Sequence, residues 1–229
     1  MFNENHSVTF RVQGDFALFS APESARNVVG AECRSYPVPT QEALRGITEA
    51  IYWTPTLKWH THRVRVLNPI QYASYGVRFP GKDAPDLFHW MLLQNVCYEI
   101  EAWFDWNHER PDLRKDRIAA KHLARFKSAL AHGGRRDIYL GSRSFQGYAE
   151  PCEFGKGPGA YDEAGYEDFG MMFHSFEYDD SPAVIKQGQA LKERFAPVQM
   201  ENGIITFVNA DKCPVVREIR EGTDYESAE

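Results

Sequence analysis

The 229-residue sequence lacks the features that mark secreted, membrane-spanning and zinc-ribbon proteins. Its four cysteines lie far apart and form no Cys-x-x-Cys pair, which argues against a zinc ribbon and against a disulfide framework. No run of about 18 apolar residues occurs, and the first residues lack the charged-then-apolar pattern of a signal peptide. We therefore expect reduced thiols, no membrane segment and a cytoplasmic location.

Positive charge is also scarce, because the sequence has 26 Lys and Arg but 32 Asp and Glu, and its net charge is −6. A chain of this charge gains no long-range attraction to phosphates, so any binding to a polyanion must be local. Hydrophobic residues make up 43% and aromatic residues 14% of the chain, which excludes wholesale disorder and allows a sizeable core.

The positive charge that is present gathers in residues 110–143. This segment holds ten Lys and Arg against three Asp, a net charge of +7, while the rest of the chain carries −13. Such a segment is suited to bind a polyanion, although a solvated basic helix would show the same pattern. The candidates for phosphate contacts are Arg114, Lys115, Arg117, Arg125, Arg135 and Arg136.

The spacing of apolar residues predicts an α+β fold for residues 1–149. The expected elements are strands at 8–12 and 16–19, a helix at 40–53 capped by Thr40, a bulged strand at 57–70, a central strand at 96–106 and a helix at 119–130. His122 lies at the margin of the apolar stripe of the second helix. This order suits a split βαβ sheet with helices on one face, the ferredoxin-like arrangement also used by RNA-recognition domains.

Gly46 stands inside the helix predicted at 40–53. Glycine costs a helix roughly 1 kcal/mol relative to alanine, so its presence needs a reason. The sequence leaves two reasons open, which are close packing of another backbone and an approaching ligand.

Residues 150–229 differ in character, with 7 basic against 17 acidic residues. Asn202-Gly203 between two apolar runs is a strong hairpin signal, and we expect a small β-rich subdomain that ends in an acidic tail. The glycine-rich loop at 155–159 lacks the spacing of a phosphate-binding P-loop.

His60 and His62 share one face of the strand predicted at 57–70. A His-x-His pair can begin a metal site, but no third ligand stands nearby in the sequence. We therefore expect neither a metal nor a cofactor.

Eight motifs spread over most of the chain resemble one protein family. They are GDFALF at 14–19, SYPVPT at 35–40, EAIYW at 49–53, VLNPI at 66–70, HERPDL at 108–113, Lys121-His122, GGRRDIYLG at 133–141 and PCEFG at 151–155. In these motifs the sequence is similar to the fifth CRISPR-associated subunit of type I-C systems, a member of the RAMP superfamily.

The resemblance implies a ferredoxin-like N-terminal domain followed by a small β-sheet domain. It also implies an endoribonuclease that cuts precursor CRISPR RNA at the base of its repeat hairpin, keeps the product and joins a multi-subunit surveillance complex. A Tyr, a Lys and a His are implicated in cleavage in this family, and their motif positions match Tyr52, Lys121 and His122.

These three residue types suit cleavage of RNA by its own 2′-OH, which yields a 2′,3′-cyclic phosphate and requires no metal. His122 can move protons near neutral pH, Lys121 can stabilise a non-bridging oxygen, and Tyr52 can orient the nucleophile. Taken one by one, however, a packed histidine, a surface lysine and a tyrosine anchor are the commoner roles.

Two other functions fit the same segment. One is a non-catalytic scaffold that binds the end of a CRISPR RNA without cutting it. The other is a metal-dependent DNA nuclease, which would need clustered carboxylates where residues 110–143 offer only Asp112, Asp116 and Asp137.

Overall fold

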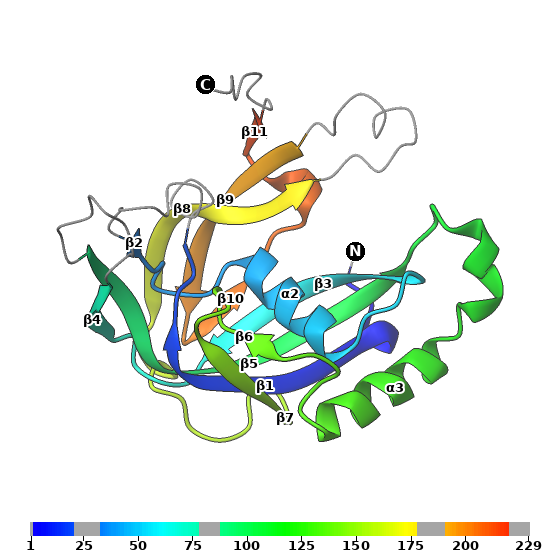
Figure 1. The fold of residues 1–229 in the computed structure, drawn as a ribbon, viewed down its shortest axis with the longest axis horizontal. Coiled ribbons are helices and arrows are strands. Elements are labelled where there is room, and N and C mark those ends of the chain that lie inside the picture. The colour runs from blue at the N-terminus through cyan, green and yellow to red at the C-terminus, as the bar shows by residue number, and fades with distance from the viewer. Residues whose placement is uncertain (1, 21–32, 78–87, 178–190, 220–229) are drawn as a thin grey trace, which may run out of the picture.

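The computed structural model describes residues 2–20, 33–77, 88–177 and 191–219, and Figure 1 shows a large sheet accompanied by few helices. The helices are α2 (Gln41–Ile51), α3 (Ala119–Ala131) and three short 3-10 turns, η1 (Glu4–His6), η2 (Pro111–Asp116) and η3 (Ala210–Lys212). The strands are β1 (Ser7–Ala17), β2 (Cys33–Arg34), β3 (Leu57–Val66), β4 (Tyr72–Val77), β5 (Phe88–Trp106), β6 (Ile138–Tyr139), β7 (Gln146–Pro151), β8 (Tyr166–Glu177), β9 (Leu191–Glu201), β10 (Ile204–Thr206) and β11 (Val215–Ile219). No described helix is both long and apolar enough to cross a membrane.

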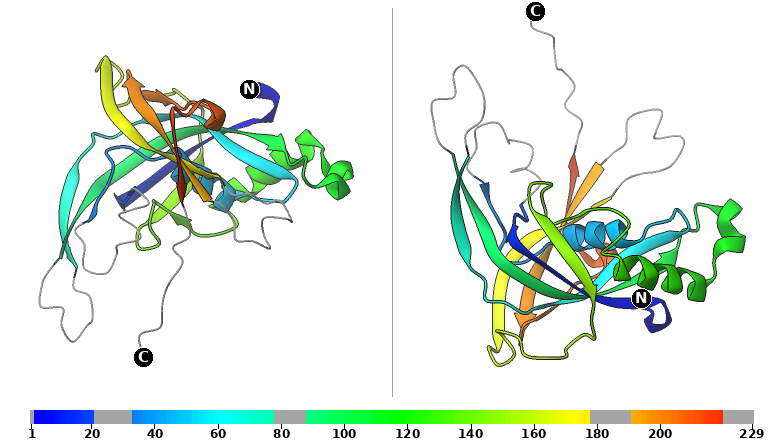
Figure 2. Two further views of the ribbon diagram at one scale, coloured as in Figure 1. Left: turned by 90° about the horizontal axis from the view of Figure 1, so that it is seen from above. Right: turned by 60° about the horizontal axis from the view of Figure 1, so that its bottom comes forward.

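The sheet runs in the order β11-β9-β10-β3-β5-β1-β7-β6, with β2 and β4 also paired to β5 and β8 paired to β9. Of the pairings between described strands, only that of β2 with β5 is parallel. The sheet curls strongly, as the two views of Figure 2 show. The strand predicted at 96–106 is central, as expected, but it begins at Phe88 and pairs with β4 through its additional residues.

β1 is one continuous strand, so the prediction of two separate strands at 8–12 and 16–19 was wrong. Gly14 lies in the strand interior because a Cβ there would stand 2.5 Å from Leu140 Cδ1. The glycine makes room for a neighbouring side chain instead of turning the chain. The bulge predicted in 57–70 is confirmed between Thr61 and Arg63, although β3 ends at Val66.

α2 and α3 cover the same face of the sheet (Figure 1). The Thr40 side chain caps α2 by accepting a hydrogen bond from the Ala43 N–H at 3.2 Å, which confirms the predicted start. The buried stripe of α2 consists of Leu44, Ile47, Thr48 and Ile51. In α3, Phe126 packs against Phe10 of β1 and Trp59 of β3, with ring centroids 5.8 and 5.2 Å apart.

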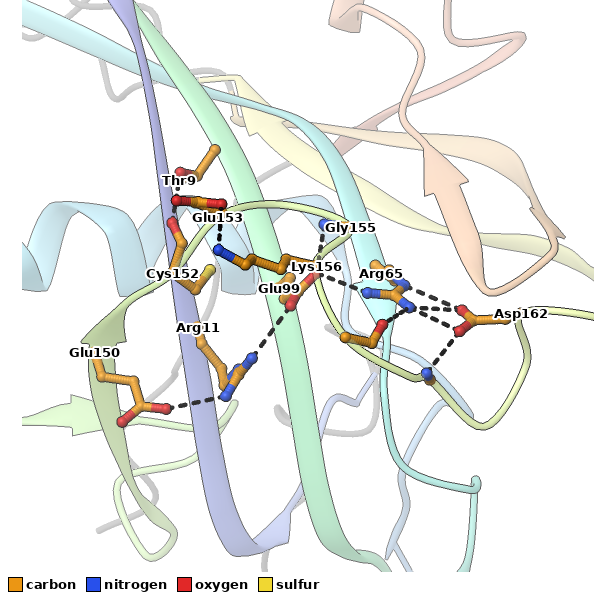
Figure 3. Close-up of polar contacts among 12 residues, drawn as sticks. Thr9, Arg11, Arg65, Glu99, Glu150, Cys152, Glu153, Gly155, Lys156 and Asp162 are labelled. Atoms are coloured by element: carbon orange, nitrogen blue, oxygen red, sulfur yellow. Dashed lines mark hydrogen bonds and ion pairs between the residues drawn. The ribbon is translucent and has the colours of Figure 1, made fainter.

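The opposite face carries a buried carboxylate, Glu99 of β5 (Figure 3). It accepts hydrogen bonds from Arg11 at 3.3 Å, Arg65 at 3.2 Å and the Gly155 N–H at 2.8 Å. Arg65 continues to Asp162 at 2.7 Å. These bonds hold the glycine-rich loop at 155–159 against the sheet, which gives the loop a structural role.

The C-terminal strands extend the same sheet. The hairpin predicted at Asn202-Gly203 is confirmed, and both residues have the positive φ that a tight hairpin turn requires, 46° and 79°. β10 then pairs with β3, and β7 crosses the predicted domain boundary at 149/150. The division into two domains stays a prediction, and the acidic tail at 221–229 lies outside the described residues.

Candidate functional site

The structure brings Tyr52 and His122 into direct contact. Tyr52 is the first residue after α2 and has an extended backbone, with φ −155° and ψ 119°, so its ring leaves the helix towards α3. The phenol oxygen lies 2.9 Å from His122 Nδ1. Both residues have 0% of their surface exposed, although they stand among polar and charged neighbours.

The neighbours of His122 define its hydrogen-bonding roles. Its Nε2 lies 2.8 Å from the carbonyl oxygen of Asp116, which can only accept, so Nε2 carries a proton. In the neutral imidazole Nδ1 is then the acceptor for the Tyr52 hydroxyl. The rings of Phe104 and Trp106 lie edge-on to the imidazole, with centroids 6.2 and 5.9 Å away, and fix its orientation.

Lys121 joins this pair through Asp116. The Asp116 carboxylate forms an ion pair with Lys121, accepts a hydrogen bond from Thr56 Oγ1 at 2.7 Å and lies 3.4 Å from His122 Nε2. The hydrogen bond from Lys121, followed by that from Thr56, lowers the pKa of Asp116. The carboxylate thus occupies the position between the lysine and the imidazole where an anion would be stabilised.

No sequence motif marks Thr56, and Asp116 was predicted only as an acidic residue of the basic segment and as a possible carboxylate of a metal-dependent nuclease. No spacing rule links Thr56 to a residue 60 positions later, so its contact becomes visible only when the turn before β3 and the end of η2 are placed together.

The glycine-rich segment brings Arg135 to the same site. Gly133 and Gly134 have φ of 81° and 109°, and they turn the chain from α3 back to the end of α2. There the Arg135 N–H donates to the carbonyls of Ala50 and Ile51 at 3.2 Å, which satisfies terminal groups of the helix. The Arg135 guanidinium lies 4.3 Å from the centroid of the Tyr52 ring, within the range of a cation–π contact.

The other predicted phosphate contacts are distributed over a wider surface. Arg114, Lys115 and Arg125 are exposed on η2 and α3. The Arg117 guanidinium makes a hydrogen bond within the protein, because it donates to the carbonyl of Asn107 at 3.0 Å. Arg136 is exposed beside α2 and donates to the Glu49 carbonyl at 3.1 Å.

His60 and His62 of β3 both pack against aromatic rings. His60 stacks on Trp103 with centroids 4.7 Å apart, and His62 stacks on Phe2 at 4.0 Å. Burial lowers the pKa of both imidazoles. In the part of the chain that the structure describes, no three His, Cys, Asp or Glu residues come together as metal ligands would.

Comparison with known proteins places the chain in a family. A family model described as "CRISPR-associated protein (Cas_Cas5)" matches residues 7–208. A protein of Thermus thermophilus named CRISPR pre-crRNA endoribonuclease Cas5d is 29% identical over 184 residues, which are 75% of this chain and 74% of that protein.

Solved structures agree with this match. A crystal structure described as a CRISPR-associated protein is 34% identical, with a TM-score of 0.77 over 92% of this chain and 96% of the other. The functionally uncharacterized protein SMU1763c from Streptococcus mutans is 35% identical, with a TM-score of 0.76 and the same coverage. The chain therefore belongs to the Cas5 family of CRISPR-associated proteins, in the group represented by the Cas5d model.

Proposed function

We propose that the chain is a metal-independent endoribonuclease that cleaves precursor CRISPR RNA at the base of its repeat hairpin. The hydrogen bond between Tyr52 and His122, next to Lys121 and Arg135, is the observation that carries the proposal. The name of the Thermus thermophilus relative, a pre-crRNA endoribonuclease, supports it.

In the proposed reaction the 2′-OH of the RNA attacks the adjacent phosphate. His122 acts as the general base or general acid of this reaction, and Tyr52 orients the imidazole and the nucleophile. Lys121 neutralises a non-bridging oxygen of the transition state. The products are a 2′,3′-cyclic phosphate and a 5′-OH, which conserves the atoms of the RNA and consumes no water.

Access to these groups requires one local change. In the described conformation the Asp116 carboxylate pairs with Lys121, and the Asp116 carbonyl oxygen accepts a hydrogen bond from His122 Nε2. The scissile phosphate, which has the same charge sign as the carboxylate, replaces Asp116 as the partner of Lys121. η2, which ends at Asp116, is a short 3-10 element without buried residues and can move at low cost.

The same proposal includes the fold and the partners. The strand order β7-β1-β5-β3, with α2 between β1 and β3 and α3 between β5 and β7, supports a ferredoxin-like unit in residues 1–149 followed by a β-rich part in residues 150–229. The chain acts in the cytoplasm, keeps its RNA product and is a subunit of a type I-C surveillance complex.

The test is incubation with labelled repeat RNA in excess chelator. One substrate is intact and the other carries a 2′-deoxy nucleotide at the scission point. We expect cleavage of the intact RNA alone, and His122→Ala to bind the RNA without cutting it. Cleavage of the 2′-deoxy substrate would exclude the mechanism, and cleavage that needs a metal would favour the metal-dependent nuclease.

A non-catalytic RNA-end-binding scaffold is the second candidate. The complete burial of Tyr52 and His122 favours it, because a covered pair can serve to dock α2 on α3. For this function, the wild-type chain binds repeat RNA tightly and leaves it intact under every condition of the test.

A further inference from the structure

A groove of about 650 Å³ lies along the outer side of α2, next to the candidate site. One wall is the helix and the other is the segment 136–143, which includes β6; Figure 1 shows β6 beside α2. On the helix, the lining residues 43, 46, 47 and 50 recur at intervals of three and four positions and form one stripe, and Glu49 lines the groove beside it. This stripe shares Ile47 with the buried stripe of α2 and otherwise differs from it, because Leu44, Thr48 and Ile51 do not line the groove.

Gly46 lies in this stripe and explains why the groove is open. A Cβ built on Gly46 would meet no atom within 4 Å, so close packing of another backbone is not the reason for the glycine. Of the two reasons that the sequence left open, an approaching ligand is the one that remains. A side chain at this position would point into the groove and take up the space.

The groove offers both charges and an aromatic ring. Arg136, Asp137 and Arg143 lie on one wall of the groove and Glu49 on the other, so the lining is balanced in charge and does not suit a phosphate alone. Carboxylates accept hydrogen bonds from the amino groups of bases, and Glu49 and Asp137 are two such groups in the lining. Tyr139, with 37% of its surface exposed, presents a ring on which a base can stack.

The groove reaches the part of α2 that directly precedes Tyr52. The Arg136 N–H donates to the Ala50 carbonyl at 3.1 Å, and Ala50 lines the groove two residues before Tyr52. A nucleotide in the groove is therefore a close neighbour, along the RNA, of a ribose beside Tyr52 and His122.

We propose that this groove binds an unpaired nucleotide that flanks the scissile bond, with the base beside Gly46 and Tyr139 and its phosphates on Arg136 and Arg143. The inference rests on the proposed function, because it takes RNA as the ligand. It adds a site for single-stranded RNA to the phosphate contacts of the basic segment.

The test compares Gly46→Leu with Gly46→Ala in the full chain. Both replacements favour the helix, so both variants should unfold at a temperature equal to or above that of the wild type. Gly46→Leu fills the groove, and we expect it to weaken binding of the labelled repeat RNA roughly tenfold or more, the scale of a lost base stack, while Gly46→Ala stays within about twofold. Tyr139→Ala removes an exposed ring and should weaken binding like Gly46→Leu.

A second arm places an abasic nucleotide at each unpaired position around the scission point. We expect one abasic position to weaken binding to the wild type and to have no further effect in Gly46→Leu. Wild-type affinity in both Gly46→Leu and Tyr139→Ala would overturn the inference while leaving cleavage untouched. If the wild type binds but never cleaves, the proposed function fails, and the binding of the two variants still decides whether the groove takes a nucleotide.

Discussion

The phenol of Tyr52 and the imidazole of His122, 70 residues apart in the sequence, share a 2.9 Å hydrogen bond that is fully shielded from solvent. This bond joins the end of α2 to the first turn of α3, so it contributes to the fold as well as to the candidate chemistry. Activity and stability have to be measured together at this site.

Tyr52→Phe keeps the ring and removes the hydroxyl. It leaves His122 Nδ1 without its donor, and we expect a loss of roughly 1–3 kcal/mol in the free energy of unfolding. Cleavage of repeat RNA should fall while binding is unchanged.

His122→Ala should reduce the cleavage rate by about 100-fold to 10,000-fold, the range for a lost proton-transfer group.

The control for both variants is His132→Ala, which removes an exposed histidine at the end of the same helix. Single-turnover cleavage and urea unfolding give the two readouts. A His122→Ala variant that cleaves at the rate of His132→Ala would show that the imidazole takes no part in the reaction.

Asp116→Asn should change how stability depends on acid. The pKa of Asp116 is lowered from its ordinary value of 3.8 by Lys121 and Thr56. The carboxylate therefore stabilises the fold above its ordinary pKa, and this contribution is lost as the pH falls through the lower folded value. The gap in free energy of unfolding between wild type and variant should be constant well above the ordinary pKa of 3.8 and should shrink as the pH falls below it.

Urea titrations at several pH values measure this gap. Thr56→Val, which removes one of the two donors, should show an intermediate dependence on pH. Parallel curves for the wild type and Asp116→Asn would contradict the assignment.

Gly141→Ala should destabilise the chain more than Gly157→Ala. Both glycines have φ of 88°, where a side chain costs about 1–2 kcal/mol. At Gly141 a Cβ would also stand 1.9 Å from the carbonyl oxygen of Leu18, whereas nothing lies within 4 Å at Gly157. Thermal unfolding of the two variants separates backbone strain from the clash, and equal losses would mean that Leu18 moves away freely.

Glu99→Ala should cost about 3–5 kcal/mol, because it leaves the nearly buried Arg65 without one of its counter-charges. The matched variant is Glu109→Ala, which breaks an exposed ion pair with Lys58 and should cost at most about 1 kcal/mol. Urea unfolding of both variants tests the difference. A loss at Glu99 as small as that at Glu109 would show that water reaches Arg65 in its place.

Local sequence signals predicted the elements that depend on local chemistry. The cap at Thr40, the turn at Asn202-Gly203 and the central strand around Ile100 follow from short-range rules, and the structure confirms them. The continuity of β1 through Gly14 was not predicted, because the role of this glycine is set by Leu140, a residue far along the chain.

In the candidate site, too, contacts between residues far apart in the chain could not be predicted from local sequence signals. Helical periodicity put His122 at the margin of the apolar stripe of α3, yet the residue is buried because Trp106 and Phe104 of β5 cover it. The motif positions brought Tyr52, Lys121 and His122 together in the prediction, whereas the contribution of Asp116 depends on η2 folding back over them.

The pairing of β10 with β3 means that removing the C-terminal part of the chain would uncover an edge of the sheet. Three residues of β3, from Arg63 to Arg65, share this ladder with β10. A protein cut after residue 149 would expose that row of amides and carbonyls as a free strand edge, which recruits other chains. The acidic C-terminal third thus also protects the basic part of the molecule from self-association.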